Sequence, residues 1–496
     1  MDLQPAAPDT LLQPGAACWR IEPASRVAVI IDADAYFRAA RAAMLAAERR
    51  IMLVGWDFDA RIVLPGAEED GGPERLGDFI LWLVRRRPAL EVNVLRWRLG
   101  ALAALFRGNT LLYVLRWMHH PRITLQLDGA HPPGASHHQK IVVLDDSLAF
   151  CGGIDMTADR WDRREHRDDE PRRRKPGGRP YPPWHDATTA LEGAAARAIG
   201  DLARERWRCA GGAALAPVPT RGPFWPEGLG PDFTEIEVGI ARTLPGNGDT
   251  EAVHEIEALY LALIARARRR IYAESQYFSS RRIAEAIARR LDEPDGPEIV
   301  LINPLTAQGW LEPIAMDTAR ARLREALRRH DRNGRFRLYH PYTAGGTPIY
   351  VHAKILVIDE EVLRIGSSNL NNRSLRLDTE CDVVIDAARP ANAAAGPAIA
   401  AIRDGLLAEH LGVPPAEITR RLAEGGSLID TIEALRGPGR SLRPYETPDL
   451  NAVEAWLADN EILDPEGPEE MFEAPSRRGL FRRLRLWRPR LWRRHR

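Results

Sequence analysis

The sequence predicts an α/β fold of two pseudo-symmetric halves, each a mixed sheet flanked by helices, followed by a helical C-terminal extension. Two observations predict the duplication. The apolar segment Ile51–Asp59 has the pattern of a buried strand, and Ile271–Ser279 repeats that pattern 220 residues later. A His-x-Lys-x4-Asp string also occurs twice, starting at His138 and at His352, a spacing of 214 residues. The similar spacings indicate one supersecondary unit that occurs twice.

Each half has the same order of elements around its first strand. A helix rich in alanine and arginine precedes the strand, and an amphipathic helix, a short apolar strand and the motif-bearing strand follow it. These four elements are residues 36–50, 76–87, 92–95 and 140–144 in the first half, and 252–270, 282–291, 299–302 and 354–358 in the second. Strands that alternate with helices indicate βαβ units and a mixed or largely parallel sheet in each half.

Changes in composition predict the boundaries. Residues 211–232 are rich in Gly and Pro, which is typical of a linker. The charged, proline-containing run Arg163–Pro183 predicts a mobile surface loop. An Ala-rich helix is expected up to Leu411, and a short helix near Pro415–Glu424. We expect a first half over 20–210, a linker over 211–235, a second half over 236–411, a helical or irregular extension over 412–476 and a basic tail over 477–496.

The charged residues are distributed unevenly. The 69 basic and 69 acidic side chains balance, so the average surface does not predict a nucleic-acid partner. Only three of the basic residues are lysine, and two of these, Lys140 and Lys354, follow a motif histidine by two residues. Because lysine is a compact point charge and arginine a planar fork, these lysines indicate a site that needs a point charge.

The remaining composition bears on compartment and partners. Four cysteines lie far apart without a Cys-x-x-Cys pair, so we expect neither a disulfide framework nor a thiolate zinc site. Residues 1–13 lack the pattern of a signal peptide, and no window of about 18 apolar residues predicts a transmembrane helix. We expect a cytoplasmic, monomeric protein that associates peripherally with membranes.

The expected membrane contact is the tail. Residues 477–496 hold ten arginines and no acid, and the apolar side chains fall on one side of a helix: Leu480, Phe481, Leu484, Trp487 and Leu491. A basic amphipathic segment of this kind suits the surface of an anionic membrane. A basic terminus without function and a segment that binds RNA or DNA are the alternatives.

The motifs carry the candidate chemistry. Their members are His138, Lys140 and Asp145 in the first copy and His352, Lys354 and Asp359 in the second. On an extended strand residues i and i+2 share a face, so each His and Lys can point toward one spot. The apolar residues between Lys and Asp would anchor the strand in the core.

A loop follows each motif at the same distance. Asp155 lies ten residues beyond the first motif aspartate, after Gly153, and Asn369 lies ten residues beyond the second, after Gly366 and Ser368. Glycine lets a backbone approach a ligand closely, and Ser or Asn can donate hydrogen bonds to phosphate oxygens. We therefore expect these five residues to form phosphate-binding loops.

The paired motifs with these loops resemble the phospholipase D superfamily. The segments Gly152–Asp162, Pro183–Asp186 and Ser275–Phe278 are similar to those of its phosphatidylcholine-cleaving branch. The resemblance covers about residues 20 to 411. It implies hydrolysis of a glycerophospholipid to phosphatidic acid and a free headgroup, or transfer of the phosphatidyl group to another alcohol.

The resemblance also implies the residue roles. His138 attacks phosphorus to give a phosphohistidine, and His352 acts as acid and base, although the sequence alone does not order the two. Both lysines, with Ser368 and Asn369, would hold the non-bridging oxygens, with no metal or cofactor.

Each imidazole needs a carboxylate on its other nitrogen to fix its tautomer. By the family pattern Glu380 would serve His138 and Asp186 would serve His352. The motif aspartates Asp145 and Asp359 are expected to brace the motif strands.

Three alternatives remain from the sequence. A cardiolipin synthase-type transferase would use the same residues with a different acceptor. A nuclease is disfavoured because the core has no basic excess, and a non-catalytic lipid-binding relic conflicts with two intact motifs. His119, His120 and His131 are not expected to bind a metal, since no acidic residue stands at ligand spacing.

Overall fold

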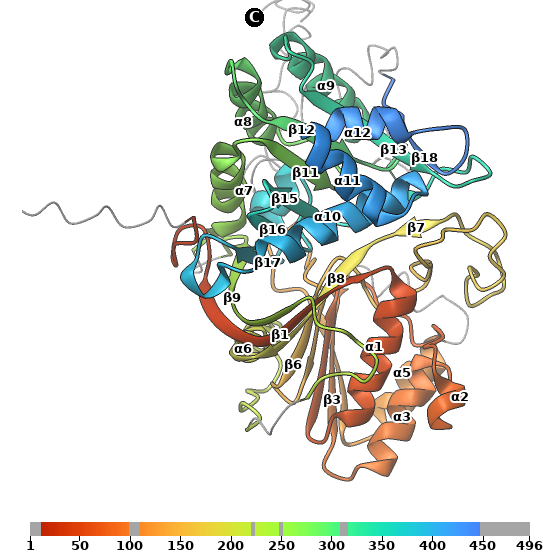
Figure 1. The fold of residues 1–496 in the computed structure, drawn as a ribbon. Coiled ribbons are helices and arrows are strands. Elements are labelled where there is room, and N and C mark those ends of the chain that lie inside the picture. The colour runs from red at the N-terminus through yellow and green to blue at the C-terminus, as the bar shows by residue number, and fades with distance from the viewer. Residues whose placement is uncertain (1–10, 99–109, 220–223, 248–250, 308–315, 447–496) are drawn as a thin grey trace, which may run out of the picture.

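The computed structural model describes residues 11–98, 110–219, 224–247, 251–307 and 316–446. Figure 1 shows the first half, coloured red to yellow, below the second half, coloured green to blue. Within the described residues one sheet of 16 strands runs through both halves. Its two central strands, β1 and β9, pair antiparallel and join the halves.

The strand order is the same in both halves. From the centre outward the first half runs β1 (Arg20–Ile31), β8 (Ala187–Gly193), β6 (Leu148–Gly152), β5 (Ile141–Leu144), β2 (Arg50–Gly55), β3 (Glu91–Trp97) and β4 (Ile123–Asp128). The second half runs β9 (Phe233–Leu244), β17 (Glu380–Asp386), β16 (Val362–Gly366), β15 (Ile355–Ile358), β11 (Arg270–Glu274), β12 (Glu298–Ile302) and β13 (Phe336–Tyr342).

Strand direction also repeats. In each half the three outermost strands named above are parallel, and the inner ones are antiparallel. The predicted mixed sheet with flanking helices in two related halves is therefore confirmed.

Helices cover the outer face of each half. The first half uses α1 (Ala33–Ala46), α2 (Ala67–Asp70), α3 (Leu76–Arg86) and α5 (Thr110–Met118), and the second uses α7 (Glu255–Arg266), α8 (Arg281–Asp292) and α9 (Thr318–His330). Every second residue of the strands packs in the hydrophobic cluster beneath these helices, as Val142 and Leu144 of β5 do. Because successive side chains of a strand point to opposite faces of the sheet, the residues between them are buried on the other face.

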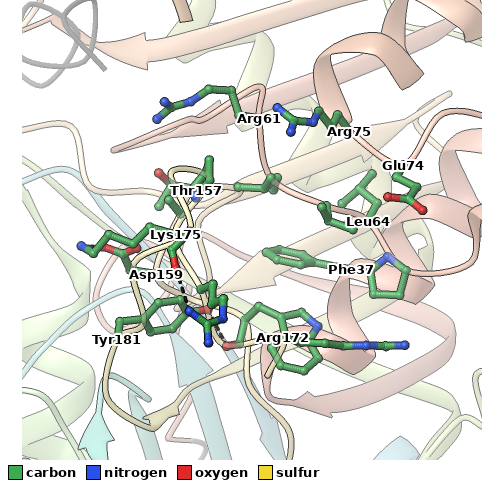
Figure 2. A pocket seen from close by; sticks show the side chains of 18 of the residues that line it. Phe37, Arg61, Leu64, Glu74, Arg75, Thr157, Asp159, Arg172, Lys175 and Tyr181 are labelled. Atoms are coloured by element: carbon green, nitrogen blue, oxygen red, sulfur yellow. Dashed lines mark hydrogen bonds and ion pairs between the residues drawn. The ribbon is translucent and has the colours of Figure 1, made fainter. Parts of the chain in front are cut away.

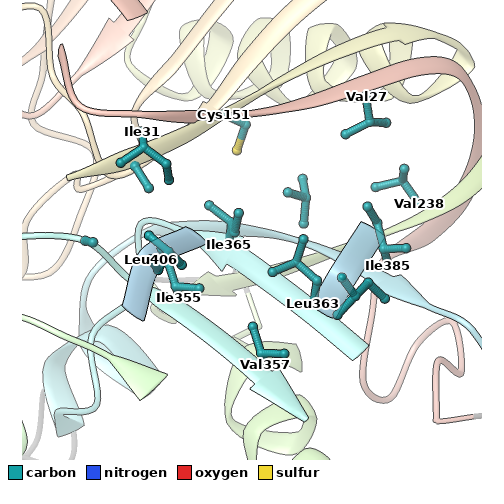
Figure 3. Packing of buried hydrophobic residues seen from close by; sticks show 14 of the residues in the cluster. Val27, Ile31, Cys151, Val238, Ile355, Val357, Leu363, Ile365, Ile385 and Leu406 are labelled. Carbon is teal, nitrogen blue, oxygen red and sulfur yellow. The ribbon is translucent and has the colours of Figure 1, made fainter. Parts of the chain in front are cut away.

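A central core joins the two halves. It contains the other strand faces, including Val27 and Cys151 from the first half and Ile355 and Ile365 from the second, as Figure 3 shows. Helices α6 (Ala194–Cys209) and α10 (Gly396–Leu411) complete this core. Because the core draws on both halves, the relative position of the two motif strands is fixed by packing.

The extension and one loop differ from expectation. After α11 (Pro415–Gly425) and α12 (Leu428–Leu435), the short strand β18 (Ser441–Pro444) pairs with β13 and extends the sheet. The segment Arg163–Pro183 was predicted to be a surface loop, but His166 and Arg173 within it are buried. The prediction is wrong at these residues because both side chains bond to the buried Asp162. The tail at 477–496 lies outside the described residues.

Candidate active site

Residues of the second half place the first histidine. His137 forms an isolated parallel bridge with Thr379, and the backbone N–H of His138 donates to the carbonyl of Thr379 at 3.0 Å. Glu380 is the next residue, and its Oε1 lies 2.9 Å from Nδ1 of His138. The bridge thus sets a carboxylate against one nitrogen of the imidazole.

Residues of the first half place the second histidine in the same way. β7 (Trp184–His185) pairs in parallel with β14 (Tyr350–Val351). The backbone N–H of His352 donates to the carbonyl of His185 at 2.7 Å, and Nδ1 of His352 lies 2.7 Å from Oδ2 of Asp186. Each half therefore supplies the carboxylate for the histidine of the other half, and the site requires both.

Both lysines are buried beside their histidines. Nζ of Lys140 donates to the carbonyl of His138 at 2.8 Å and lies 3.3 Å from Oδ2 of Asp155. Nζ of Lys354 donates to the carbonyl of His352 and to Oε1 of Gln276, the latter at 3.3 Å. The ammonium groups are thus held close to the imidazoles by their own backbone.

Burial and like charge control protonation in the site. Burial, then Lys140 and Lys354, holds the pKa of His138 well below its usual range. Burial, then Lys354, has the same effect on the pKa of His352, to which Arg160 and Lys140 also contribute. Because each histidine responds to the lysines of both motifs, the two motifs form one electrostatic unit.

The other titratable groups respond to the same environment. Burial lowers the pKa of Lys354 to about 7, with a further lowering by Lys140 that Asp186 opposes. Burial also raises the pKa of Glu380 to about 8 and that of Asp186 above its usual value. The environment of the site thus favours neutral imidazoles, which are the nucleophilic form.

We expect the alkaline limb of kcat/KM to come from Lys354. A lysine is charged below its pKa, so loss of the Lys354 charge should lower kcat/KM by up to about tenfold per pH unit above pH 7. A pH profile of the wild type and of Lys354→Arg tests this, because a guanidinium stays charged and moves the limb to higher pH. An unchanged limb in the variant would refute the assignment.

The downstream loops use Asp155 and Asn369 in equivalent ways. Oδ1 of Asp155 accepts from the backbone N–H of Trp56 at 3.0 Å, and Oδ1 of Asn369 accepts from that of Gln276 at 3.3 Å. These acceptors tie one loop to the residue that follows β2 and the other to the residues that follow β11. Asp155 also lies 3.3 Å from the ammonium of Lys140, and because it is an aspartate where the second loop has an asparagine, the two loops differ in charge at equivalent places.

The glycines of these loops leave room for carboxylates. A Cβ at Gly153 would collide with Oδ1 of Asp186, which orients His352. A Cβ at Gly366 would collide with Asp382. Close approach of the chain to a side chain, rather than to a ligand, thus explains both glycines.

Ser368 lies beside a buried ion pair. Its hydroxyl donates to Oδ2 of Asp382 at 2.6 Å and accepts from Arg364, within a buried ion pair. The Ser368 hydroxyl is thus engaged by this ion pair, and its contact with phosphate stays a prediction. The neighbouring Ser367 donates instead to Oε2 of Glu380 and so belongs to the His138 side of the site.

The motif aspartates lie at the far ends of their strands. Asp145 and Asp359 have φ of 49° and 52° and begin the three-residue connections from β5 to β6 and from β15 to β16, where a short polar residue tolerates positive φ. Their carboxylates accept from three successive backbone N–H groups each: Glu48, Arg49 and Arg50 in one half and Arg268, Arg269 and Arg270 in the other. Both aspartates brace the strands and do not touch the imidazoles.

Asp145→Asn should reduce stability rather than change the chemistry. An amide oxygen replaces a carboxylate that accepts three N–H groups, and we expect the free energy of unfolding to fall by about 1–3 kcal/mol. Urea unfolding measures this, with the exposed Asp295→Asn as a matched control that should stay within about 0.5 kcal/mol of wild type. Equal stability of the two variants would contradict the bracing role.

Sequence reasoning missed several residues at the site. Trp184 packs against His352 with ring centroids 5.1 Å apart, and Arg160 stands 4.2 Å over the Trp184 ring. Trp56 meets His138 edge-on at 6.5 Å. Arg160 and Trp184 occur in the segments that carry the family resemblance, so only that signal could have found them.

The histidines at 119, 120 and 131, which were not expected to bind metal, have other contacts. His131, for example, accepts a hydrogen bond from the indole N–H of Trp97 at 2.9 Å.

A separate pocket opens on the first half. Figure 2 shows Phe37 and Leu64 in its lining, with the basic side chains of Arg61, Arg172 and Lys175 around them. Its volume is about 430 Å³, and neither motif contributes to its lining. The pocket is therefore distinct from the histidine pair.

Comparison with known proteins links these features to one family. A family model described as phospholipase D matches residues 43–220, and one described as cardiolipin synthase, PLD-like domain, matches residues 260–395. Each match contains one of the two motifs.

Two relatives and one solved structure extend the comparison. Phospholipase D alpha 1 of Carica papaya is 24% identical over 405 residues, which are 60% of this chain and 49% of the relative. Cardiolipin synthase A of Pseudomonas fluorescens is 26% identical over 249 residues, which are 49% of this chain and 43% of the relative. The chain thus spans about half the length of these curated relatives.

The crystal structure of phosphatidylserine synthase from Haemophilus influenzae Rd KW20 aligns with a TM-score of 0.50 and 13% identity. The alignment covers 83% of this chain and 96% of that one, and at this identity it shows a shared fold alone. Two family models match successive halves of the chain, and the structure shows a duplicated sheet with a histidine pair built across the halves. These findings together show that the chain belongs to the phospholipase D superfamily.

Proposed function

We propose that the chain is a phospholipase D-type phosphodiesterase that transfers the phosphatidyl group of a glycerophospholipid to water or to an alcohol. The observation that carries this proposal is the crossed pairing of His138 with Glu380 and of His352 with Asp186. Because a carboxylate engages Nδ1 in each ring, Nε2 is the nitrogen available for chemistry in both.

The first step forms a covalent intermediate. Nε2 of His138 attacks phosphorus as the P–O bond to the headgroup breaks, and His352 gives its proton to the leaving oxygen. The anionic phosphodiester offsets the charge of the lysines, so its binding raises the pKa of His352 toward the protonated form. Lys140 and Lys354 stabilise the charge on the non-bridging oxygens.

The second step releases phosphatidic acid. His352, now neutral, takes a proton from water as the water oxygen attacks phosphorus and the P–N bond to His138 breaks. A primary alcohol in place of water gives the corresponding phosphatidyl alcohol. His138 is assigned as nucleophile because its side chain is 16% exposed, compared with 6% for His352.

The experiment offers the purified protein phosphatidylcholine, phosphatidylglycerol and bis(4-nitrophenyl) phosphate, with and without EDTA and 1-butanol. We expect phosphatidic acid, its replacement by phosphatidylbutanol when butanol is present, and no effect of EDTA during the assay. A requirement for an added divalent ion, or cleavage of DNA alone, would overturn the proposal.

A cardiolipin synthase-type transfer is the second candidate. It is favoured by the family model over residues 260–395, whose description names cardiolipin synthase. The same histidines would then pass the phosphatidyl group to a glycerol hydroxyl of phosphatidylglycerol. Phosphatidylglycerol as sole lipid distinguishes the two, because transfer gives cardiolipin and free glycerol whereas hydrolysis gives phosphatidic acid.

Membrane contact is proposed to come from the tail. Among the described helices none combines the length and apolar content needed to cross a bilayer. Ten arginines at 477–496 would each gain about 1 kcal/mol near anionic lipid. We expect a chain that ends at residue 476 to lose most of its sedimentation with phosphatidylglycerol vesicles, and to behave like the full chain with neutral vesicles. Unchanged binding to the anionic vesicles would show that the tail does not provide the membrane contact.

A further inference from the structure

Four buried side chains form a cluster next to the active site, which we call the histidine–carboxylate cluster. Its members are Asp32, His166, His185 and Glu409. Asp32 follows β1, His166 lies in the loop after β6, His185 belongs to β7, and Glu409 belongs to α10. Each is at most 8% exposed, so the cluster is closed to bulk solvent.

The ligand-type atoms of the cluster stand at metal-site separations. Nε2 of His166 lies 3.1 Å from Oε1 of Glu409 and 3.5 Å from Oδ2 of Asp32. Nδ1 of His185 lies 2.9 Å from the same Oε1 of Glu409. Four ligands at 2.0–2.1 Å from a tetrahedral zinc ion are about 3.3 Å apart, which is the middle of this range.

Both histidines are oriented as metal ligands usually are. Nδ1 of His166 lies 3.0 Å from Oδ2 of Asp162, and Nε2 of His185 lies 2.7 Å from Oε2 of Glu274. A carboxylate on the second nitrogen fixes the tautomer that presents a lone pair to a metal. The nitrogens that face into the cluster are therefore those that would bind an ion.

Two atoms of the cluster lack ordinary hydrogen bonds. Within the described chain neither Oδ2 of Asp32 nor Nδ1 of His185 makes a hydrogen bond of acceptable geometry, although both are buried and Nδ1 of His185 lies 2.9 Å from Oε1 of Glu409. A buried polar atom without a partner is costly, and a cation between them would satisfy both. Two carboxylates would also balance the charge of one divalent ion.

We propose that Asp32, His166, His185 and Glu409 bind one zinc ion as a closed structural site. Oxygen and imidazole ligands in a four-coordinate arrangement suit zinc, and four protein ligands leave no position for substrate. The ion would hold α10 and the His166 loop against β7. Because His185 accepts the backbone N–H of His352 and precedes Asp186, the site fixes the strand that positions the second histidine.

Metal content tests the site without any measurement of turnover. The full chain, purified without a polyhistidine tag, is refolded with zinc, dialysed, and analysed by mass spectrometry of the metal. We expect about one zinc per chain in the wild type and in His119→Gln, an exposed histidine, and at least a tenfold loss in His166→Gln. Less than about a tenth of an equivalent in the wild type, or equal zinc in both variants, would overturn the proposal.

The zinc absorption edge of the wild type provides a test that does not depend on the folding of a variant. Two imidazole and two oxygen ligands at about 2.0–2.1 Å are expected, and sulfur ligands or six oxygens would contradict the assignment. Failure of this site leaves the proposed phosphatidyl transfer intact, since the carbonyl of His185 accepts the backbone N–H of His352 without an ion.

Discussion

His138→Ala is expected to reduce kcat at least about 10⁴-fold with every phospholipid, because it removes the imidazole assigned as the nucleophile. Its folding should be preserved, since the His138 ring is partly exposed and its loss leaves the Glu380 carboxylate with the hydroxyl of Ser367. Initial rates with phosphatidylcholine, under conditions that saturate the wild type, measure the effect.

The matched control for this prediction is His119→Ala. His119 is exposed and bonds only to the carbonyl of Leu115 in its own helix, among the contacts of the described chain. Its activity should equal that of the wild type. A loss smaller than about tenfold in His138→Ala would show that this histidine is not the nucleophile.

His352→Asn is expected to separate the two chemical steps. Hydrolysis of phosphatidylcholine should fall about 10³-fold, because the headgroup oxygen leaves without a proton. With bis(4-nitrophenyl) phosphate, nitrophenolate leaves without protonation, so His138 can still be phosphorylated. Stopped-flow absorbance should then show a burst of one nitrophenolate per chain followed by slow turnover.

The control for the burst is the double variant with His138→Ala, which should show none. An exposed replacement, His330→Asn, should keep full steady-state turnover, as its side chain is 45% exposed and pairs with Asp292 on the surface. A burst that persists in the double variant would mean that another residue carries the phosphoryl group.

The duplicated fold was predictable because its signals are local. Ile51 to Leu53 and Ile271 to Ala273 alternate between the core faces and recur at one spacing, so both strands were found from pattern alone. The long strands β1 and β9 were not predicted, since they begin with mixed polar sequence and join the halves through pairing. Strand β18 was missed for the same reason, because its place depends on the edge left by β13.

The site was predictable where a string of adjacent residues defines it. The motif histidines and lysines follow from spacing, and Glu380 and Asp186 followed from the family pattern. The surroundings of Ser368 could not be predicted, because sequence does not show which of two adjacent serines turns toward Glu380 and which toward the Arg364–Asp382 pair.

The histidine–carboxylate cluster could not be predicted from the chain. Asp32 and Glu409 are 377 residues apart in the sequence, and no spacing rule joins them to His166 and His185. His166 also lies within a run of charges that resembles solvated surface, and only the fold shows that it is buried.

Trapping the intermediate tests the central claim most directly. Wild-type protein mixed with a 32P-labelled phosphatidic ester is quenched in alkali, which preserves phosphohistidine, digested, and sequenced by mass spectrometry. The account predicts label that is lost in acid and lies on the peptide containing His138, with His352 unmodified. Label on His352, or rapid product formation with no labelled peptide, would contradict it.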